Sequence, residues 1–269
     1  MPTAAVIGAI AGDIIGSVYE GGGPPPAGFP LFRSQSRFTD DTVLSVAVAS
    51  TFTSDLPYDV ALRQWGRRYP HAGYGGWFRR WLIQDDAGPY NSFGNGSAMR
   101  VAAVGWACET LDDVLREAER SAIVTHDHAE GIKGAKAVAA AVFLGRKGSA
   151  KVEIAALLED VFGYRCDRDM AALRAEGPVD VTCQHTVPAA AVAFLQATDF
   201  ETTIRNAISL GGDTDTTACI AGALAEAFHG GVPEAIEDEV FAHLDDALRA
   251  EVLRFCRSFA VPLHRHRRA

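Results

Sequence analysis

Two short clusters of carboxylates and hydroxyls, about 170 residues apart, hold the side chains of this chain that are best suited to chemistry. They are Thr39-Asp40-Asp41-Thr42 and Asp213-Thr214-Asp215-Thr216. Each precedes apolar residues at helical spacing, so both are predicted at helix N-termini, where one Asp or Thr serves as a cap. Four carboxylates brought together would repel one another unless a cation lay among them. Oxygen ligands without Cys or His favour Mg²⁺ or Mn²⁺ over zinc.

A helix predicted over residues 4–20 supplies two further carboxylates. Three glycines share one face of this helix: Gly8, Gly12 and Gly16. Glycine destabilises a helix interior by about 1 kcal/mol, so this stripe predicts that another backbone packs very close and that the helix is central. We interpret Asp13, on the apolar side, as a buried carboxylate that holds helix starts together. Glu20 precedes the Gly/Pro loop 21–26, which makes it the better candidate for chemistry or gating.

A third candidate segment is residues 91–100, which open another predicted helix. Its small and amide residues are Ser92, Gly94, Asn95, Gly96 and Ser97. The free N–H groups and the positive dipole end of such a helix suit a phosphate. An ordinary helix start is the alternative, and the turn alone favours it. Most nearby aromatic residues are expected in the core, while Phe93 is positioned to stack on a planar ligand.

The fourth segment is Thr125-His126-Asp127-His128. Thr125 is the expected cap of the helix that follows. Two histidines two residues apart on a helix face different directions, so they cannot bind one metal from one face. One is expected to cap or pair with a neighbour, and the other is expected to reach the pocket. Zinc is disfavoured because the segment has no third nitrogen or sulfur ligand at metal-binding spacing.

Composition restricts the class of protein. A chain of 269 residues that is 48% hydrophobic is long enough for one large core, and we expect a single domain over 1–269. The net charge of −9 argues against a general nucleic-acid binder, and we interpret the basic stretch at about 263–269 as a solvated tail. Five scattered cysteines indicate reduced thiols of a cytoplasmic protein. The longest apolar run, 137–144, is too short to cross a bilayer, and we expect no signal peptide.

The spacing of apolar residues is helical along nearly the whole chain, and alternating runs typical of strands are scarce. An all-α fold follows. The predicted helices cover residues 4–20, 40–54, 58–70, 97–108, 110–122, 127–145, 150–162, 187–197, 200–209, 214–229 and 235–258, the last of them broken.

Taken together and in this order, the motifs resemble the ADP-ribosylglycohydrolases, typified by the dinitrogenase reductase-activating glycohydrolase and the ADP-ribosyl-acceptor hydrolases. The resemblance runs from Gly8 to about Gly230. The segments that carry it are Gly8 to Gly16 continuing to Tyr19-Glu20, Phe38 to Thr42, Gly94 to Arg100, Thr125-His126, and Ser209 to Thr216. One such motif is suggestive, whereas five in order are highly specific.

The resemblance implies a compact orthogonal helical bundle with two bound divalent cations, Mg²⁺ or Mn²⁺. The implied metal ligands are Thr39, Asp40, Asp41, Asp213, Asp215 and Thr216. By the same resemblance, residues 92–97 would hold the pyrophosphate and adjoining ribose, and His126 would line the adenosine side. Glu20 falls where a branch similar to the ADP-ribosyl-serine hydrolases has a mobile gating glutamate, and that branch has an aromatic at the position of Phe93.

The implied reaction releases ADP-ribose from an ADP-ribosylated protein or another ADP-ribosylated acceptor, with nucleic acid included only if it is the modified acceptor. The bond breaks through an oxocarbenium-like transition state. Asp40, Asp41 or Glu20 would accept a proton from water or stabilise the forming cation. Two alternatives remain at this point: a binuclear-metal phosphohydrolase, and a non-catalytic ADP-ribose-binding or structural member of the family. The acceptor linkage is not encoded in any of these motifs.

Overall fold

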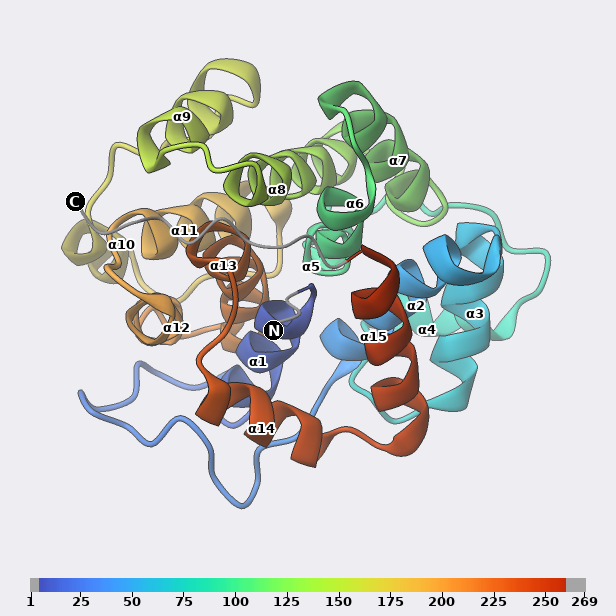
Figure 1. Cartoon of the computed structure of the whole chain (residues 1–269), viewed down its shortest axis with the longest axis horizontal. Helices are drawn as coiled ribbons and strands as arrows, with labels where there is room; N and C mark the ends of the chain where they lie inside the picture. Colours follow the sequence, from blue (N-terminus) through green and yellow to red (C-terminus); the bar gives the residue numbers. More distant parts are fainter. Residues whose placement is uncertain (1–4, 260–269) are drawn as a thin grey trace.

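Helices make up nearly all the regular structure in the computed structural model of the protein, which describes residues 5–259 (Figure 1). Strand pairing in that range is confined to two isolated bridges, Gly94 with Thr182 and Val179 with Gly212. The all-α prediction is therefore confirmed. The basic tail expected at about 263–269 lies outside the described residues.

The first eight elements are α1 (Ile7–Gly16), α2 (Asp40–Ser54), α3 (Tyr58–Arg68), α4 (Gly76–Ile83), α5 (Gly96–Met99), α6 (Ala102–Ala107), α7 (Leu111–Ile123) and α8 (Ala129–Arg146). They are followed by α9 (Lys151–Ala156), a π-helical turn (Leu157–Val161), α10 (Met170–Glu176), α11 (Cys183–Leu195), α12 (Phe200–Ile208), α13 (Thr214–His229), α14 (Glu234–His243) and α15 (Asp246–Phe259). The longest connections in the described range are residues 17–39, between α1 and α2, and residues 84–95, between α4 and α5.

Several predicted helix boundaries were wrong. The first helix ends at Gly16 rather than at residue 20, so Glu20 lies in the turn beyond it. The segment predicted over 97–108 is interrupted between α5 and α6. Helix α11 begins at Cys183, four residues before the predicted start, and contains Pro188. Pro188 is the sixth residue of α11 and lies beyond the first turn, so the helix lacks the hydrogen bond from residue 188 to the carbonyl of Gln184.

Helices α4 and α10 were not predicted at all. Both are short, and glycines lie immediately before or at the start of α4 and after α10. The sequence of α4 nevertheless contains a helical pattern. Its buried residues are Phe78, Trp81 and Leu82, and the last two follow Phe78 by three and four positions. That spacing is typical of one face of a helix.

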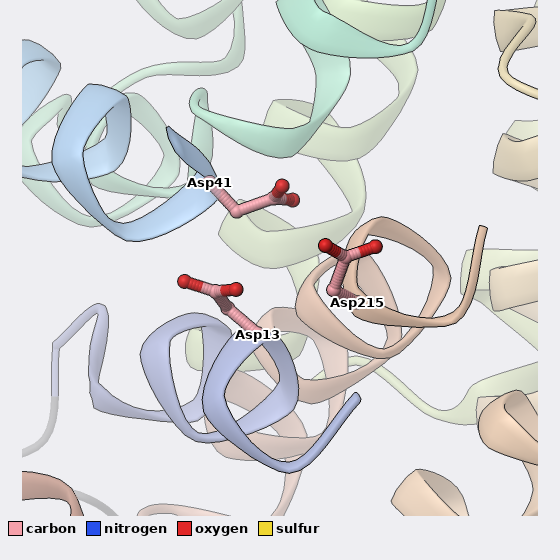
Figure 2. A group of neighbouring side chains, drawn as sticks. All are labelled: Asp13, Asp41 and Asp215. Carbon is pink, nitrogen blue, oxygen red and sulfur yellow. The ribbon is translucent and has the colours of Figure 1, made fainter. Parts of the chain in front are cut away.

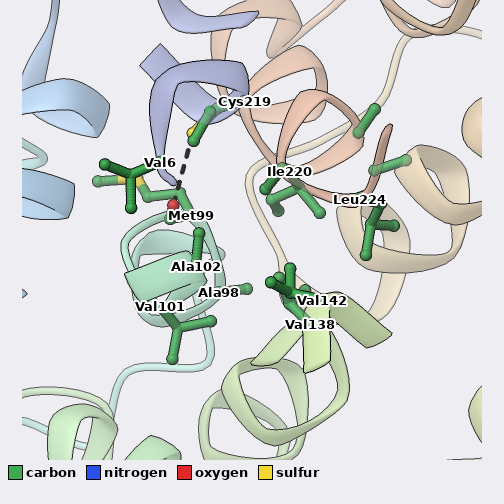
Figure 3. Close-up of a cluster of buried hydrophobic side chains, with 14 of the residues drawn as sticks. Val6, Ala98, Met99, Val101, Ala102, Val138, Val142, Cys219, Ile220 and Leu224 are labelled. Carbon is green, nitrogen blue, oxygen red and sulfur yellow. Dashed lines mark hydrogen bonds between the residues drawn. The ribbon is translucent and has the colours of Figure 1, made fainter. Parts of the chain in front are cut away.

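Helix α13 lies at the centre of the bundle and packs against α1, α8, α11 and α12. Every residue of α13 from Thr214 to Ala227 is buried, as is every residue of α1. The side chains of Ile220 and Leu224 on α13 face Val138 and Val142 on α8, as Figure 3 shows. The central position that the glycine stripe predicted for α1 is confirmed.

The glycine stripe sets the distance between α1 and α13. A Cβ atom at Gly12 would lie 2.0 Å from the carbonyl oxygen of Ala218, and one at Gly8 would lie 2.4 Å from that of Gly222. Such distances are far shorter than any van der Waals contact, so only glycine allows the two backbones to approach this closely. The start of α13, which holds Asp215, is thereby fixed against the end of α1.

Buried carboxylates cap the starts of two helices. Glu226 on α13 accepts hydrogen bonds from the backbone N–H groups of Ile7 and Gly8, at 3.2 and 2.9 Å. Helix α1 has no side-chain cap of its own at Val6, so Glu226 binds two of the N–H groups that a helix start leaves without partners. In the same way, Asp13 accepts hydrogen bonds from the backbone N–H groups of Thr39 and Thr42 at the start of α2. The expected role of Asp13 is confirmed.

We expect Glu226→Gln to flatten the pH dependence of stability. Burial raises the pKa of Glu226 from its usual 4.5 to about 8. The folded protein therefore holds this proton more tightly than the unfolded chain, and the resulting stability is complete below about pH 4.5 and lost as the pH rises through 8. Thermal midpoints between pH 5 and 9 should show that the variant is less stable than the wild type at low pH and that the difference shrinks as the pH rises. The exposed Glu234→Gln variant is the control. Stability curves for Glu226→Gln that run parallel to the wild-type curves would contradict the expectation.

The five cysteines are free thiols. Among residues 5–259, no helix combines the length and the apolar character that crossing a membrane requires.

Candidate active site

Three helices bring carboxylates to one point inside the bundle. Asp41 lies at the start of α2, Asp215 at the start of α13 and Asp13 within α1, and Figure 2 shows the three side chains in the space where these helices meet. One oxygen atom from each lies within 4.8 Å of the others. A second group, formed by Glu20, Asp213 and Asp215, meets the same distance criterion. Asp215 belongs to both groups, so the two clusters predicted from the sequence do converge.

The carboxylates differ in how their oxygens are used. Both oxygens of Asp13 accept hydrogen bonds from Thr39 and Thr42. Oδ2 of Asp41 accepts hydrogen bonds from the hydroxyls of Thr216, at 3.1 Å, and Thr39, at 3.4 Å, while its buried Oδ1 has no partner among residues 5–259. A buried carboxylate oxygen without a donor is costly. It is suited to a cation, and Asp41 is thus the clearest candidate ligand.

Mutual repulsion perturbs the whole cluster. Burial, followed by the charges of Asp13 and Asp40, raises the pKa of Asp41 well above its usual value. Burial and the charge of Asp41 likewise raise the pKa of Asp215. For Asp40 the pKa rises to about 7, first through burial and then through the charge of Asp13. Bringing ionised carboxylates together in this way is unfavourable without a cation, and oxygen donors of this type fit Mg²⁺ or Mn²⁺.

A glycine turn directs Asp213 into the site. Gly211 and Gly212 both have left-handed backbone conformations, with φ of 70° and 77°. A Cβ atom at Gly212 would lie 2.1 Å from the carbonyl oxygen of Val179. The turn is further tied to the chain after Glu20, because the N–H of Gly21 donates to the carbonyl of Gly212 at 2.9 Å. This bond explains why Glu20 lies beside Asp213 although it is outside α1.

The carboxylates form one end of a cavity of about 350 Å³. Most of the predicted site residues line it, and they are Glu20, Asp40, Asp41, Ser92, Gly94, Asn95, Gly96, His126, Asp213, Asp215 and Thr216. Asn95 joins two of the segments that line the cavity, because its amide Nδ2 donates to Oδ2 of Asp213 at 2.5 Å. The structure therefore joins four segments that are distant in the sequence into one pocket.

Three predicted site residues are not among the residues that line the cavity. Thr39 is buried and caps α2 by accepting a hydrogen bond from the N–H of Asp41. Ser97 is fully buried, and its hydroxyl donates to the carbonyl of Gly131 at 2.7 Å. Phe93 is 47% exposed, with its ring 5.4 Å from that of His128. The side chains of Ser97 and Phe93 are thus placed outside the cavity wall.

The two histidines have the different roles that their spacing predicted. His128 caps α8, accepting a hydrogen bond on Nδ1 from the N–H of Glu130 at 3.1 Å. Thr125 was expected to be this cap, and that expectation was wrong. His126 is almost completely buried and lines the cavity. Burial, followed by the charge of Arg100, lowers the pKa of His126 well below its usual value, so the ring is neutral.

Arg100, Tyr90 and Trp77 also line the cavity, although the sequence did not single them out as site residues. Trp77 is 66% exposed and stacks on Tyr90, with ring centroids 6.4 Å apart. Tyr90 in turn lies 6.0 Å from the ring of His126. The neighbours Tyr74 and Phe78 are buried, so the expectation that most of these aromatics belong to the core is correct for them and wrong for Trp77. Trp77 is the second residue of α4, and because this helix was not predicted, the exposed face on which Trp77 lies was not recognised.

Comparison with known proteins identifies the family. A model of the ADP-ribosylglycohydrolase family matches residues 3–267, and the chain belongs to this family. It is 26% identical to ADP-ribosylhydrolase ARH3 of Homo sapiens, covering 91% of this chain and 90% of that one. It is also 26% identical to the ADP-ribosylarginine hydrolase Tri1 of Pseudomonas putida, covering 84% and 70%. A solved structure of an ADP-ribosylglycohydrolase-related protein complex superposes with a TM-score of 0.71 at 25% identity, covering 95% and 96%.

Proposed function

We propose that the protein hydrolyses the glycosidic bond between ADP-ribose and an acceptor and releases ADP-ribose. The observation that carries the proposal is the cavity, which places a cluster of buried carboxylates next to a neutral wall formed by glycines, an amide and His126. The family match and the relatives that are named as hydrolases of ADP-ribose linkages support it. The acceptor would be an ADP-ribosylated protein or another ADP-ribosylated molecule.

The proposed cofactors are two divalent cations, Mg²⁺ or Mn²⁺. The residues that would hold them are Thr39, Asp40, Asp41, Asp213, Asp215 and Thr216. The support is the oxygen of Asp41 that has no donor and the convergence of the two acidic clusters. Bound cations of this kind orient substrate hydroxyls and lower the pKa of water. Asp13 is not proposed as a ligand, because both of its oxygens are engaged by Thr39 and Thr42.

We propose that residues 92–97 hold the pyrophosphate and adjoining ribose, and that His126 lines the adenosine side. Gly94 and Gly96 leave room for a ligand to approach the backbone, and a Cβ atom at Gly96 would lie 3.1 Å from Nε2 of His126. For Phe93 and Ser97, only backbone atoms would contribute, since their side chains do not line the cavity.

Glu20 is the carboxylate proposed to accept the proton of the attacking water. It lines the cavity beside Asp213 and Asp215 but is exposed, whereas Asp41 is buried and better placed as a ligand. Burial and the charge of Asp213 raise the pKa of Glu20, which makes the carboxylate a stronger base. If the anomeric carbon binds beside Glu20, this carboxylate would also stabilise the positive charge of the transition state.

Glu20→Gln is expected to lower turnover by roughly 10²- to 10⁴-fold, the usual contribution of a general base. The affinity for ADP-ribose should change little, because the amide has nearly the same shape. Single-turnover rates and calorimetric titration with ADP-ribose measure the two quantities separately. Turnover at the wild-type rate would show that Glu20 is only an exposed residue at the cavity rim.

Gly96→Val is expected to weaken ADP-ribose binding by at least about tenfold while the protein remains folded. The added side chain would press on His126 and fill the space through which a ligand approaches the backbone. Calorimetry with ADP-ribose measures the loss, and circular dichroism confirms the helical content. Gly88→Val is a matched control, since Gly88 has no atom within 4 Å of its Cβ position. Unchanged affinity in Gly96→Val would place the nucleotide elsewhere.

The function is tested by incubating the purified protein and Mg²⁺ or Mn²⁺ with defined ADP-ribosylated acceptors: an arginine N-glycoside, a serine O-glycoside, a nucleobase adduct, poly(ADP-ribose) and O-acetyl-ADP-ribose. Mass spectrometry of the products should detect intact ADP-ribose. AMP or inorganic phosphate would instead indicate a phosphohydrolase, and binding without any product would indicate a non-catalytic ADP-ribose-binding protein.

We further propose that residues 1–269 form a single domain. We also propose that the protein is cytoplasmic, on the basis of its free cysteines.

A further inference from the structure

Arg100 is a buried cation without a carboxylate partner. Its side chain is fully buried and lines the cavity. Nη2 donates to the carbonyl of Ser121 at 2.8 Å and to the hydroxyl oxygen of Thr125 at 2.9 Å. Nε and Nη1 have no hydrogen-bond partner among residues 5–259. Burying an unpaired charge is expensive, which suggests that this arginine has a role beyond packing.

The hydroxyl of Thr125 connects Arg100 to His126. Its Oγ1 lies 2.8 Å from Nδ1 of His126 and accepts the hydrogen bond from Arg100. A guanidinium has donors only, so the direction of that bond is fixed. The hydroxyl proton then remains available to be donated to Nδ1, which requires a lone pair on that nitrogen.

Electrostatics favours the same arrangement. If Nδ1 carried the proton, its N–H and the N–H of Arg100 would both point at the oxygen of Thr125, with two positive ends facing each other. With the lone pair on Nδ1, the negative end of the imidazole faces the guanidinium. Burial and the charge of Arg100 also lower the pKa of His126, so the doubly protonated ring is disfavoured. In a neutral imidazole only one of the two ring nitrogens bears a proton. In His126 this nitrogen is Nε2, because Nδ1 carries the lone pair.

We propose that Arg100, acting through Thr125, holds His126 as the neutral tautomer with the proton on Nε2, so that the ring offers an N–H donor to a ligand in the cavity. The Nε2 atom faces the glycine wall, 3.1 Å from the Cβ position of Gly96 and 3.8 Å from that of Gly94. The ligand atom it recognises is therefore an acceptor, such as a phosphate or hydroxyl oxygen. Arg100 is a positioning residue. That the ligand is ADP-ribose rests on the proposed function.

The tautomer can be read directly from the ligand-free wild-type protein by ¹⁵N–¹H correlation spectra of the histidine rings at neutral pH. Since the chain has eight histidines, the signal of His126 is assigned by its loss in His126→Gln. A protonated Nε2 and an unprotonated Nδ1 are expected. A proton on Nδ1, with the hydroxyl of Thr125 donating to another group such as Tyr90, or a doubly protonated ring, would overturn the proposal. This measurement does not depend on what the enzyme hydrolyses.

A pair of variants at Thr125 tests the connection. Thr125→Val keeps the shape but removes the hydroxyl, whereas Thr125→Ser keeps the hydroxyl. We expect the valine variant to lose the tautomer preference and to bind ADP-ribose about tenfold more weakly, as expected for one charge-assisted hydrogen bond. The serine variant should retain both properties. A wild-type ring spectrum and affinity in folded Thr125→Val would disprove the role of the hydroxyl, while absence of ADP-ribose binding by the wild type would refute the ligand and leave the tautomer result standing.

Discussion

Asp41→Asn should make the ion-free protein more stable and the enzyme nearly inactive. Asp41 is fully buried, and the charges of Asp13, Asp40 and Asp213 oppose its ionisation. The amide cannot ionise, keeps an oxygen for the hydroxyl of Thr216, and places N–H donors at the position of Oδ1, which accepts no hydrogen bond among residues 5–259. Relief of repulsion should raise the thermal midpoint in EDTA. A bound ion contributes several kcal/mol of charge stabilisation, so turnover should fall about a thousandfold.

The same variant should lose the response to added cations. Mg²⁺ or Mn²⁺ binds the native wild type preferentially and should raise its thermal midpoint, whereas Asp41→Asn should show little or no increase. Asp112→Asn is the matched control, because Asp112 is exposed in the first turn of α7 and should leave both the activity and the cation response unchanged. Scanning calorimetry with and without EDTA measures the response. Full wild-type activity in excess EDTA, with no metal found by elemental analysis, would refute the binuclear hydrolase.

Gly12→Ala is expected to destabilise the protein by more than about 4 kcal/mol and to prevent folding if the wild type is of ordinary stability. In an unconstrained helix, this change would be favourable by about 1 kcal/mol. Here the new methyl group would lie 2.0 Å from the carbonyl oxygen of Ala218 and 2.6 Å from the backbone nitrogen of Cys219. Backbone atoms cannot change rotamer to make room, so α1 and α13 must separate.

Denaturant unfolding of Gly12→Ala and Gly76→Ala side by side checks this expectation. Gly76 begins α4 and has no atom within 4 Å of its Cβ position, so its replacement should be neutral or slightly stabilising. A Gly12→Ala protein with wild-type stability would mean that α1 and α13 are farther apart than the structure shows. Because Asp13 on α1 caps α2, separation of α1 from α13 would also move Asp41 away from Asp215, so loss of the cation response should accompany any partly folded Gly12→Ala protein.

The sequence was most informative where a chemical requirement left a local pattern. The glycine stripe predicted the close packing of α1, and the isolated Asp13 on its apolar side was correctly interpreted as a buried cap. Clusters of Asp and Thr at two helix starts correctly indicated that both would face one cavity. These features were readable because the residues that carry each one lie within a few turns of each other.

Other parts of the site depend on contacts that no local pattern encodes. Arginine is usually exposed, yet Arg100 is fully buried and donates hydrogen bonds to Ser121 on α7 and to Thr125 beyond its end. Ser97 was grouped with the glycine turn, but the direction of its side chain is decided by the carbonyl of Gly131 on α8. Glu20 was predicted at the end of a helix. It lies instead beyond the end of α1, where the hydrogen bond from the N–H of Gly21 to the carbonyl of Gly212 fixes the position of the chain.

The contact of Gly12 with Ala218 also has a consequence for biosynthesis. These residues are about 200 positions apart in the chain. At a translation rate of about 5–20 residues per second, α1 would emerge from the ribosome roughly 10–40 s before its partner helix. During this interval the apolar faces of α1 have no α13 to cover them, and Asp13 has no Asp215 beside it. No nascent chain that stops short of α13 can assemble the carboxylate cluster, so activity should appear only after α13 has been synthesised.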